Sequence, residues 1–427
     1  MALQGQKIAV IGAGIAGLAS AYFLVRQHEV VLYEAGDYLG GHTHTVDVTL
    51  DEKTFAVDTG FLVFNEATYP NLIALFDELG VASYATDMSF GVSLGQGQFE
   101  WAGTNLDSVF AQRRRALSPA FLGMLCDIVR FNRTAQVNLA AALLQPLTLA
   151  QLIAAGNYGT LFRDAYLLPM AAAIWSSAPT DILEFPASTF LRFCLNHGLL
   201  QLNDRPQWRT VLGGARSYVR KIAETLSQVR LNTRVTQVFK DGDQFVVRSA
   251  ASESRFDAVV FATHAPQTLH MLSDANAEER RLLSAVRYQS NVAYLHTDSA
   301  LMPRRRKVWS SWNYLGGDSV DGKRPVCVSY WLNLLQALPC QTDVMVTLNP
   351  YAAPAPAHVI ERFDYEHPIF DQAAVAAQQQ LASIQGRRGI WFAGAWTGYG
   401  FHEDGLKSAL RVAADFSLAP AWAKVVP

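Results

Sequence analysis

The chain has 427 residues, of which 50% are hydrophobic and 17% are charged, and its 35 basic and 37 acidic side chains give a net charge of −2. A chain of this length and apolar content can bury a large core, which excludes disordered and fibrous proteins. A nearly neutral chain has no overall attraction to nucleic acid, so we expect no nucleic-acid partner. The four cysteines form no zinc or redox pair and indicate a reducing, cytoplasmic location.

The N-terminal segment predicts one βαβ unit with parallel strands. Ile8–Ile11 and Val30–Tyr33 are short β-rich runs, and the helix-like run Ile15–Gln27 lies between them. Three closely spaced glycines interrupt this apolar stretch, so it does not read as a membrane span, and we expect no transmembrane helix. The next expected elements are a helix over 68–79, strands over 83–101, and a long helical, alanine-rich and leucine-rich region over 106–202.

After a double glycine at 213–214 the pattern changes to short helices and strands. No internal repeat or long linker interrupts it, so the chain is predicted to form two interleaved domains. In chain order we expect the helix Tyr218–Leu226, the strands Val229–Phe239, Gln244–Ser249 and Asp257–Ala262, mixed strands over 286–350, a helix over 371–384, the strand Gly389–Gly394 and the helix Gly405–Phe416.

A glycine-rich turn, Gly12-Ala13-Gly14-Ile15-Ala16-Gly17, joins the first strand to the first helix. Gly12 permits the turn, Gly14 lets the backbone approach a pyrophosphate, and Gly17 lets helix and strand pack closely. The helix N-terminus adds free N–H groups and a positive dipole end. Glu34 ends the second strand, where a carboxylate binds a ribose hydroxyl and disfavours the 2′-phosphate of NADP. Together these features predict a dinucleotide site.

Further patches resemble the superfamily of flavin-containing amine oxidases, protoporphyrinogen oxidases and phytoene desaturases. The patches are Glu34-Ala35-Gly36-Asp37-Tyr38-Leu39-Gly40-Gly41, Val57-Asp58-Thr59-Gly60, Leu212-Gly213-Gly214-Ala215, Leu231–Val235, Phe256–Thr263, and Trp391-Phe392-Ala393-Gly394 followed by Gly405-Leu406-Lys407-Ser408-Ala409. The resemblance implies FAD, held non-covalently because no cysteine lies near the last glycine turn. It implies an α/β fold: a Rossmann-like FAD-binding domain of the amine-oxidase type (1–85, 205–270 and 385–427), interleaved with an α+β substrate-binding domain (86–204 and 271–384).

The same resemblance implies individual FAD contacts. His42 stands where the family usually has arginine, and the helix from Gly405 is expected to place its N-terminus under the flavin pyrimidine, where it stabilises negative charge. The expected cofactor-binding residues are Gly12, Gly14, Ala16, Gly17, Glu34, Gly40, Gly41, His42, Thr59, Gly60, Val235, Thr263, Gly394, Ala395, Gly405 and Leu406.

Three departures from the family pattern argue against an amine substrate. Ala395, followed by Trp396, replaces a common glutamate; the stretch Tyr288–Leu295 lacks the lysine that amine oxidases hold near the flavin; and His402 occupies an aromatic-cage position. A finer resemblance is to bacterial FAD-binding, amine-oxidase-like proteins of modified fatty-acid metabolism. Polyunsaturated fatty-acid double-bond isomerases look like more distant relatives.

The insert Leu106–Leu202 is apolar and densest at Tyr166–Trp175. It is either ordinary helical core or a tunnel for a lipid chain, since flavin pockets are mostly apolar. The expected substrate pocket residues are Phe64, Tyr166, Trp175, Trp331 and Trp396.

Two basic clusters, Arg113-Arg114-Arg115 and Arg304-Arg305-Arg306-Lys307, interrupt the near-neutral chain. They are either solvated faces or contacts with anionic lipid headgroups, worth about 1 kcal/mol for each basic residue near a membrane surface. The segment His42-Thr43-His44 has no third ligand at a readable spacing, so no metal site is predicted.

The candidate catalytic residues are the titratable groups at the last glycine turn, His402, Tyr399 and Glu403, although Glu403 or Asp404 is an equally good cap for the last helix. We therefore predict an FAD-dependent oxidoreductase of the oxidase or desaturase type that abstracts hydride from an apolar substrate, a fatty-acyl chain. The alternatives are a redox-neutral fatty-acid double-bond isomerase, an amine oxidase, and a flavin-binding partner subunit without turnover.

Overall fold

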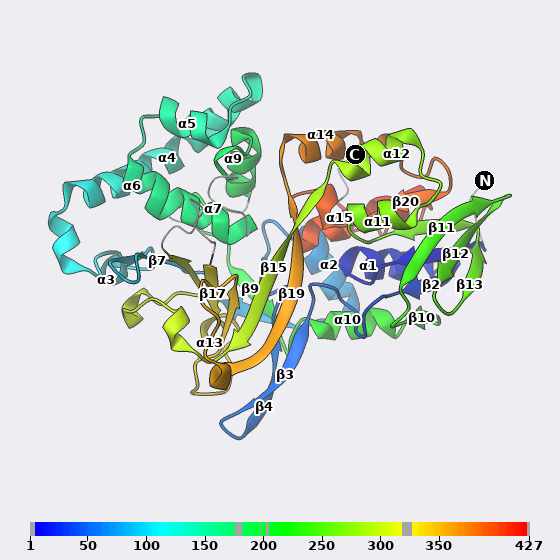
Figure 1. Cartoon of the computed structure of the whole chain (residues 1–427), viewed down its shortest axis with the longest axis horizontal. Coiled ribbons are helices and arrows are strands. Elements are labelled where there is room, and N and C mark those ends of the chain that lie inside the picture. Colours follow the sequence, from blue (N-terminus) through cyan, green and yellow to red (C-terminus); the bar gives the residue numbers. More distant parts are fainter. Residues whose placement is uncertain (1–4, 176–181, 197, 202–204, 318–326, 425–427) are drawn as a thin grey trace.

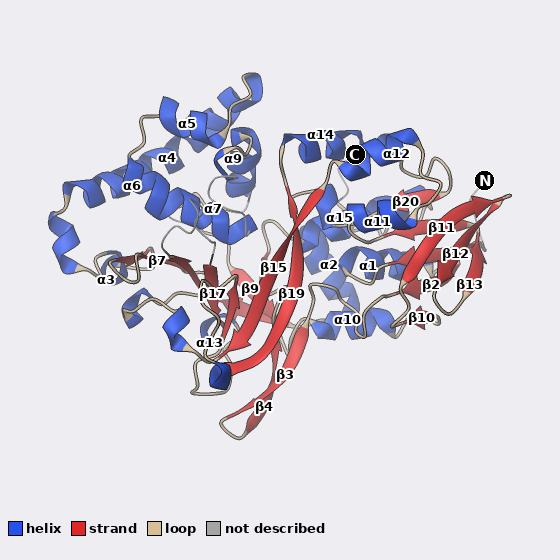
Figure 2. Cartoon of the chain, in the orientation of Figure 1, coloured by secondary structure: helices blue, strands red, loops and turns tan. Residues whose placement is uncertain are grey.

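The computed structural model describes residues 5–175, 182–196, 198–201, 205–317 and 327–424 (Figures 1 and 2). One half of the molecule is built on a five-stranded parallel sheet with the order β10-β2-β1-β14-β20. Its central strands are apolar and fully buried, as expected for a parallel sheet covered on both faces. The strands are β1 (Lys7–Ile11), β2 (Glu29–Tyr33), β10 (Val229–Arg230), β14 (Ala258–Phe261) and β20 (Ile390–Phe392).

Two different layers cover the faces of this sheet (Figure 1). Helices pack on one face through a shared apolar core: α1 (Ile15–Leu24), α2 (Pro70–Leu79), α10 (Arg216–Ala223) and α15 (His402–Asp415). The other face carries an antiparallel sheet of β11 (Val235–Asp241), β12 (Gln244–Ser249) and β13 (Glu253–Phe256), with α11 (Ala265–Met271), α12 (Ala277–Ser284) and α14 (Gln372–Gln380). This is the three-layer arrangement expected of a Rossmann-like domain.

The other half of the molecule is built on a seven-stranded mixed sheet with the order β19-β15-β18-β17-β16-β7-β8. Only β16 and β7 pair in parallel among the described strands of this sheet; the other pairs are antiparallel. Its strands are β7 (Phe90–Leu94), β8 (Phe99–Ala102), β15 (Arg287–His296), β16 (Trp312–Gly316), β17 (Cys327–Trp331), β18 (Met345–Leu348) and β19 (Val359–Ile369).

Helices of the predicted insert share one hydrophobic core with this sheet (Figures 1 and 2). They are α3 (Leu106–Val109), α4 (Pro119–Leu144), α5 (Leu149–Ala155), α6 (Thr160–Phe162), the π-helical turn η2 (Arg163–Leu167), α7 (Leu168–Trp175) and α9 (Ala187–Asn196). The 3₁₀ turn η1 (Arg113–Leu117) lies between α3 and α4 and has no buried residue. This region is helical, as predicted.

The remaining described elements are short. They are the hairpin β3 (Thr45–Leu50) and β4 (Lys53–Asp58), the small sheet β5 (Phe64–Asn65), β9 (Trp208–Val211) and β6 (Ser83–Thr86), the helix α13 (Leu332–Leu335), and the 3₁₀ turns η3 (Ser299–Leu301), η4 (Arg306–Val308), η5 (Pro356–His358), η6 (Leu381–Ser383) and η7 (Ala395–Thr397).

Two expected elements differ from the structure. The strand expected over 229–239 is split into β10 and β11, because Asn232 adopts a left-handed φ of 49° and donates its N–H to Gly36 while Thr233 donates to Glu34. The last helix begins at His402, three residues before the expected start. The predicted domain boundaries stay a prediction.

Among the described residues, no helix is long and apolar enough to cross a membrane. The longest, α4, has 26 residues but carries charged and polar side chains along its length.

Candidate active site

A cavity of about 940 Å³ lies between the two halves, at the carboxyl ends of the parallel strands. Its lining falls into two parts. The nucleotide end is formed by the first glycine turn, Glu34, the double glycine at 40–41 and residues 233–236. The apolar end is formed by Leu62, Val63, Ala173, Ile174, Trp175, Trp312, Tyr330 and Leu348.

The glycine turn is shaped by close backbone contacts. Gly12 has a φ of 98°, and a Cβ there would lie 2.7 Å from the Ala262 carbonyl oxygen. A Cβ at Gly17 would lie 1.8 Å from the Gly12 carbonyl oxygen, so only glycine lets α1 pack this close to the turn. The N-terminus of α1 therefore opens directly onto the cavity, where it can hold a pyrophosphate.

Glu34 organises this end of the cavity. Its Oε2 accepts a hydrogen bond from the Ala13 N–H, and its Oε1 accepts one from the Gly36 N–H, both at 2.8 Å. Gly40 donates its N–H to the Ala13 carbonyl oxygen at 2.8 Å, which brings the double glycine beside the turn. The carboxylate is thus fixed at the end of β2, where a ribose hydroxyl of the cofactor can reach it.

His42 supplies an observation that tests the fit of FAD. Its Nε2 is buried and has no hydrogen-bond partner in the described part of the chain. Burial, with the nearby His367, His264 and His402, holds the pKa of His42 well below its usual range, so the ring is neutral. A buried unpaired ring nitrogen lining the cavity fits a cofactor that supplies the missing partner.

A buried carboxyl anchors the segment that follows the β3–β4 hairpin. Asp58 is 1% exposed and accepts hydrogen bonds from Thr45, the Ala215 N–H and the Gln336 side chain. Burial raises the pKa of Asp58 to about 6, although these hydrogen bonds act in the opposite direction. The network positions Thr59 and Gly60 on the cavity wall.

Thirteen of the expected cofactor-binding residues line the cavity: Gly12, Gly14, Ala16, Glu34, Gly40, Gly41, His42, Thr59, Gly60, Val235, Thr263, Gly394 and Ala395. Gly17, Gly405 and Leu406 do not. A Cβ at Gly405 would lie 2.7 Å from Ile15 Cγ2, so this glycine lets α15 pack against α1 instead. Because α15 begins at His402, the N–H groups of its N-terminal turn belong to residues before Gly405.

The predicted catalytic histidine is held by the protein. His402 Nε2 lies 2.7 Å from Thr43 Oγ1 and 3.3 Å from the Tyr218 hydroxyl, and its ring stacks on Phe61 with centroids 3.7 Å apart. Burial lowers the pKa of His402 to about 3, so the ring is neutral at physiological pH. Although His402 lines the cavity, these contacts favour a packing role over proton transfer.

Glu403 does not line the cavity. Its carboxylate accepts hydrogen bonds from the Asn71 N–H and side-chain amide and from the Leu72 N–H, at 3.2, 2.6 and 3.0 Å. It therefore caps the N-terminus of α2. Asp404 caps its own helix by accepting from the Tyr399 and Phe401 N–H groups. Tyr399 itself lines the cavity, and burial raises the pKa of its hydroxyl.

The five expected substrate-pocket residues are separated by the structure. Trp175 and Trp396 line the cavity. Phe64 packs in the helical core beside the parallel sheet, and the Tyr166 ring packs against Trp101 of β8 and Phe162 of the insert. Trp331 donates to Asp343 at 3.0 Å and lies near Arg306. The last three do not line the cavity. Phe64 and Tyr166 are buried among other side chains, and Trp331 is half-buried.

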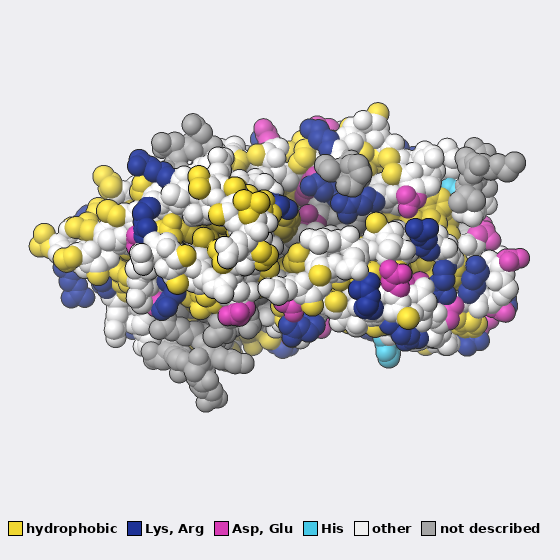
Figure 3. Space-filling view, turned by 90° about the horizontal axis from the view of Figure 1, so that it is seen from above, with side chains coloured by type: hydrophobic (Ala, Val, Ile, Leu, Met, Phe, Trp, Pro, Cys, Tyr) yellow, Lys and Arg dark blue, Asp and Glu magenta, His cyan; other side chains and the backbone are white. Residues whose placement is uncertain are grey.

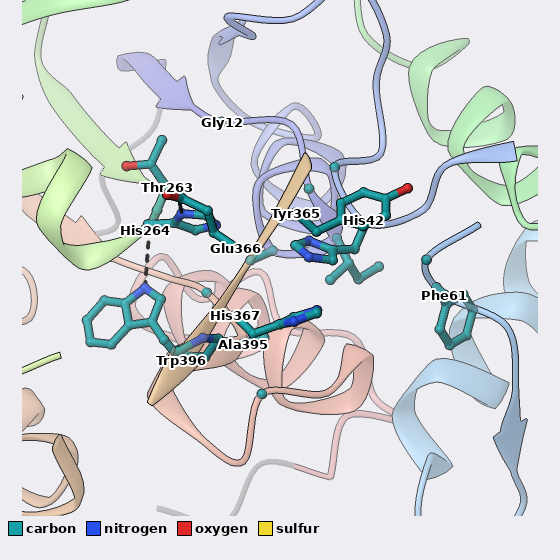
Figure 4. Close-up of a pocket in the computed structure, with 18 of the residues that line it drawn as sticks. Gly12, His42, Phe61, Thr263, His264, Tyr365, Glu366, His367, Ala395 and Trp396 are labelled. Carbon is teal, nitrogen blue, oxygen red and sulfur yellow. Dashed lines mark hydrogen bonds and ion pairs between the residues drawn. The ribbon is translucent and has the colours of Figure 1, made fainter. Parts of the chain in front are cut away.

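Among the lining residues not anticipated from the sequence are His264, Glu366 and His367 (Figure 4). His264 Nδ1 lies 3.1 Å from Glu366 Oε2, and its ring stacks on Tyr288 at 4.1 Å. Burial lowers the pKa of His264, while Glu366 acts to raise it. His264 follows β14 at the carboxyl end of a parallel strand, a position that ligands prefer and that was the available signal for it. The two β19 residues carry no motif.

A chain of amides fixes the tautomer of His367. Asn349 donates its Nδ2 to Asn291 Oδ1 at 2.7 Å, so the Asn291 amide must present its own Nδ2 to His367 Nδ1 at 2.9 Å. His367 Nδ1 is then an acceptor, and the ring proton resides on Nε2. Burial, with the nearby His264, lowers the pKa of His367 to about 4. His367 is therefore a neutral N–H donor in the cavity wall.

The His42 and His44 pair forms no metal centre. His44 Nδ1 lies 2.9 Å from Thr59 Oγ1, whereas His42 stacks on Tyr365 with centroids 5.1 Å apart. In the described ranges, no three His, Cys, Asp or Glu side chains come together as possible metal ligands.

The fold and the cavity define a dinucleotide-binding enzyme class, and comparison with known proteins gives the family. Residues 15–333 match the model of the family described as flavin-containing amine oxidoreductase, so the chain belongs to that family. Family membership makes FAD the cofactor, and the glycine turn, Glu34 and the unpaired His42 nitrogen fit it. The resemblance to this superfamily, the α/β fold class and the FAD prediction are confirmed.

Among curated proteins, the chain is 27% identical over 270 residues to a putative flavin-containing monoamine oxidase, AofH, from Mycobacterium tuberculosis, a match that covers 60% of this chain and 56% of the relative. The chain thus spans about half the length of that relative. It is 38% identical over 79 residues to a 15-cis-phytoene desaturase from Narcissus pseudonarcissus, over 18% of this chain and 13% of the relative.

Two solved structures share the fold over nearly their whole length. A CLA-producing fatty acid isomerase from P. acnes superposes with a TM-score of 0.68 at 15% identity, over 96% of this chain and 98% of the isomerase. Putrescine oxidase bound to putrescine superposes with a TM-score of 0.66 at 16% identity, over 97% and 99% of the two chains.

Proposed function

We propose that the protein is an FAD-dependent oxidoreductase that removes two hydrogens from adjacent carbons of an apolar substrate, a fatty-acyl chain. The observation that carries the proposal is the apolar end of the cavity. Its walls are aliphatic and aromatic side chains from α7 and the seven-stranded sheet, and no lysine lines the cavity in the described part of the chain. A wall of this kind binds hydrocarbon. The carboxylate of Glu366 also lines the cavity, but it lies 3.1 Å from His264 Nδ1 and outside this apolar end.

The proposed reaction converts a saturated carbon–carbon bond into a double bond. When bound, FAD supplies the two-electron acceptor that takes one hydrogen with its electron pair. The second hydrogen leaves as a proton, and a residue of the chain must accept it. The apolar end holds the acyl chain in one orientation and keeps water away from the reacting carbons.

The His264–Glu366 pair is the proposed proton acceptor. The imidazole is neutral because burial lowers its pKa, and the carboxylate 3.1 Å from Nδ1 stabilises the imidazolium that forms when the ring takes a proton. His402 is less suited, since its Nε2 already lies within hydrogen-bonding distance of Thr43 and Tyr218. His367 supports the site as a neutral N–H donor.

Anaerobic mixing tests the proposal without requiring the natural electron acceptor. The FAD-loaded protein is mixed with saturated and methyl-branched acyl lipids in one series and with putrescine and benzylamine in a second. Loss of the visible flavin absorbance with acyl lipids, together with a product two hydrogens lighter, supports the proposal. Loss with the amines alone identifies an amine oxidase, which the AofH match favours.

The isomerase alternative gives a third pattern in the same experiment. An unsaturated acyl lipid would bleach the flavin only transiently, and the product would have the mass of the substrate with its double bond moved. Turnover would then continue without any electron acceptor. A flavin that remains oxidised with every lipid contradicts both fatty-acyl reactions.

A further inference from the structure

Helix α4 is apolar on the face that packs inward. Phe121, Met124, Ile128, Phe131 and Ala135 are buried on it and belong to the core shared with the seven-stranded sheet. Their spacing of three and four residues is that of an ordinary amphipathic helix, which places the remaining residues in solvent. The outward face of such a helix is normally polar and charged.

The outward face of α4 is apolar as well. The exposed side chains include Leu122, Val137 and Leu144, with exposed fractions of 41%, 71% and 89%. Together with the exposed Cys126 and Arg133, they recur at three-, four- or seven-residue intervals and so form one stripe along the helix. Six of the eleven large hydrophobic side chains exposed in the described ranges lie between residues 106 and 144.

The charges beside this stripe are positive. No Asp or Glu of α4 is exposed; Asp127 is half-buried and pairs with Arg130 at 2.7 Å. The preceding turn η1 exposes Arg113 and Arg114 beside Leu117, which is 87% exposed. Figure 3 shows hydrophobic and basic side chains gathered at the end of the molecule where α4 begins. We call the exposed residues 113–144 of η1 and α4 the α4 face.

Lys307 adds a further positive charge to this end. Asp107 of α3 is the nearby acid, and it pairs with both Arg113 and Lys307. Its single negative charge is therefore already shared by two cations. Arg114 adds a charge that these pairs do not neutralise.

We propose that the α4 face lies on the surface of an anionic lipid bilayer. Leucine side chains on a helix parallel to the surface enter the boundary between headgroups and acyl chains, and the arginines meet lipid phosphates. The helix lies on the membrane and does not cross it. This agrees with the charged and polar side chains along α4 and with the absence of a spanning helix among the described residues. Burial of the exposed leucines removes apolar surface from water.

This inference goes beyond the proposed function and does not depend on it, since any substrate and any flavin reaction are compatible with a bilayer-bound enzyme. It would give an acyl-lipid enzyme direct access to its substrate. Vesicle binding tests whether the α4 face contacts lipid, whereas flavin bleaching tests the reaction at the active site. A negative result in one experiment therefore leaves the other proposal standing.

Vesicle co-sedimentation of the full-length, FAD-loaded protein tests the proposal. We expect binding to vesicles of mixed phosphatidylcholine and phosphatidylglycerol, weaker binding at high salt, and little binding to pure phosphatidylcholine. The double variant Arg113→Gln/Arg114→Gln should weaken the partition coefficient about 30-fold, from about 1 kcal/mol for each lost cation. Leu117→Asn/Leu144→Asn should weaken binding to anionic vesicles by a further factor of about 10 or more.

A control variant changes one exposed aliphatic side chain and one exposed arginine elsewhere. Ile360 and Arg362 are exposed on β19, and Ile360→Asn/Arg362→Gln should bind vesicles as the unaltered protein does. Equal loss of binding in the control variant and in the α4-face variants would overturn the proposal, as would unchanged binding in the α4-face variants.

A label at Cys126 gives a second, independent readout, because Cys126 is exposed on the stripe while Cys194 and Cys327 are buried. In a Cys340→Ser background, an environment-sensitive dye at Cys126 should shift to the blue with anionic vesicles and be quenched by nitroxide-labelled lipids. No shift overturns the proposal. Concentration-dependent dimerisation without lipid, lost in Leu117→Asn/Leu144→Asn, would also overturn it and assign the face to a second copy of the chain.

Discussion

Substitution of Glu403 by glutamine separates a structural role for this residue from a catalytic one. Glu403 is 3% exposed, and its carboxylate accepts three hydrogen bonds from the start of α2. Glutamine has nearly the same shape but keeps only one accepting oxygen. Its NH₂ group would face the N–H of Leu72 or of Asn71, so one donor of the helix terminus would be left unpaired in a buried place.

The size of the effect follows from these contacts. A hydrogen bond to a charged acceptor contributes about 1.5–3 kcal/mol, and a negative charge at a helix N-terminus adds about 0.3–1 kcal/mol. Glu403→Gln should therefore lower the free energy of unfolding by about 3 kcal/mol. Glu403→Leu, which removes all three acceptor contacts, should lower it by about 5 kcal/mol.

The assay combines urea unfolding with flavin reduction. Unfolding of the FAD-loaded protein is followed by near-ultraviolet circular dichroism, and reduction by substrate is measured without urea, where the variant remains folded. We expect a lower urea midpoint and an unchanged reduction rate. Glu224→Gln, at an exposed position that ends α10, is the control and should change neither. Unchanged stability with abolished flavin reduction would refute the capping account and make Glu403 catalytic.

Three further changes test other parts of the structure. Gly17→Ala places a methyl group 1.8 Å from a carbonyl oxygen of the glycine turn, so the purified protein should lose FAD, measured as the ratio of flavin to protein absorbance. Asn291→Asp offers His367 a carboxylate, so the pKa of His367 should rise from about 4 by about 1 to 3 pH units in an NMR titration. Burial raises the folded-state pKa of Asp58 from 3.8 to about 6, so the protonated carboxyl stabilises the fold at low pH. This contribution to the free energy of unfolding is lost as the pH rises from about 4 to 6. Asp58→Asn should reduce the change in the free energy of unfolding over this range by about 3 kcal/mol, measured by urea unfolding. Asp404, whose pKa burial also raises to about 6, should leave a residual dependence in that variant.

Each of these changes has a result that would contradict its reasoning. Full FAD content in Gly17→Ala would show that the turn can move, whereas Gly123→Ala on α4, where a Cβ meets nothing within 4 Å, should retain FAD. An unaltered His367 titration in Asn291→Asp would contradict the amide chain. A pH dependence between about pH 4 and 6 that is the same in Asp58→Asn as in the unaltered protein would contradict the raised pKa of Asp58.

The nucleotide end of the cavity could be predicted because its constraints are local. Gly12 needs a positive φ and Gly17 needs to be without a side chain, and both requirements arise from atoms a few residues away. Local constraints of this kind require glycines at fixed positions, so they appear in the sequence as a short motif. The role of Glu34 could be predicted for the same reason, because it follows the second strand of the same βαβ unit.

The apolar end could not be predicted in the same way. Trp312, Tyr330 and Leu348 meet only because β16, β17 and β18 pair side by side, and each is an ordinary apolar residue in its own strand. The histidines show the same limit. The position of His402 beside a glycine turn suggested catalysis, but the decisive contact comes from Thr43, 359 positions earlier in the chain.

The strand order of the parallel sheet has a consequence for how the protein is made. β1 is made before the other strands of this sheet, yet its neighbour β14 is some 250 residues away and the edge strand β20 ends at Phe392. The helix α15, which packs against α1, follows still later. Pairings this distant in sequence form slowly, and partly synthesised chains expose apolar surface meanwhile. The FAD site can therefore be completed only after β20 and α15 have emerged, and until then the apolar faces of β1 and α1 lack their partners from the later part of the chain.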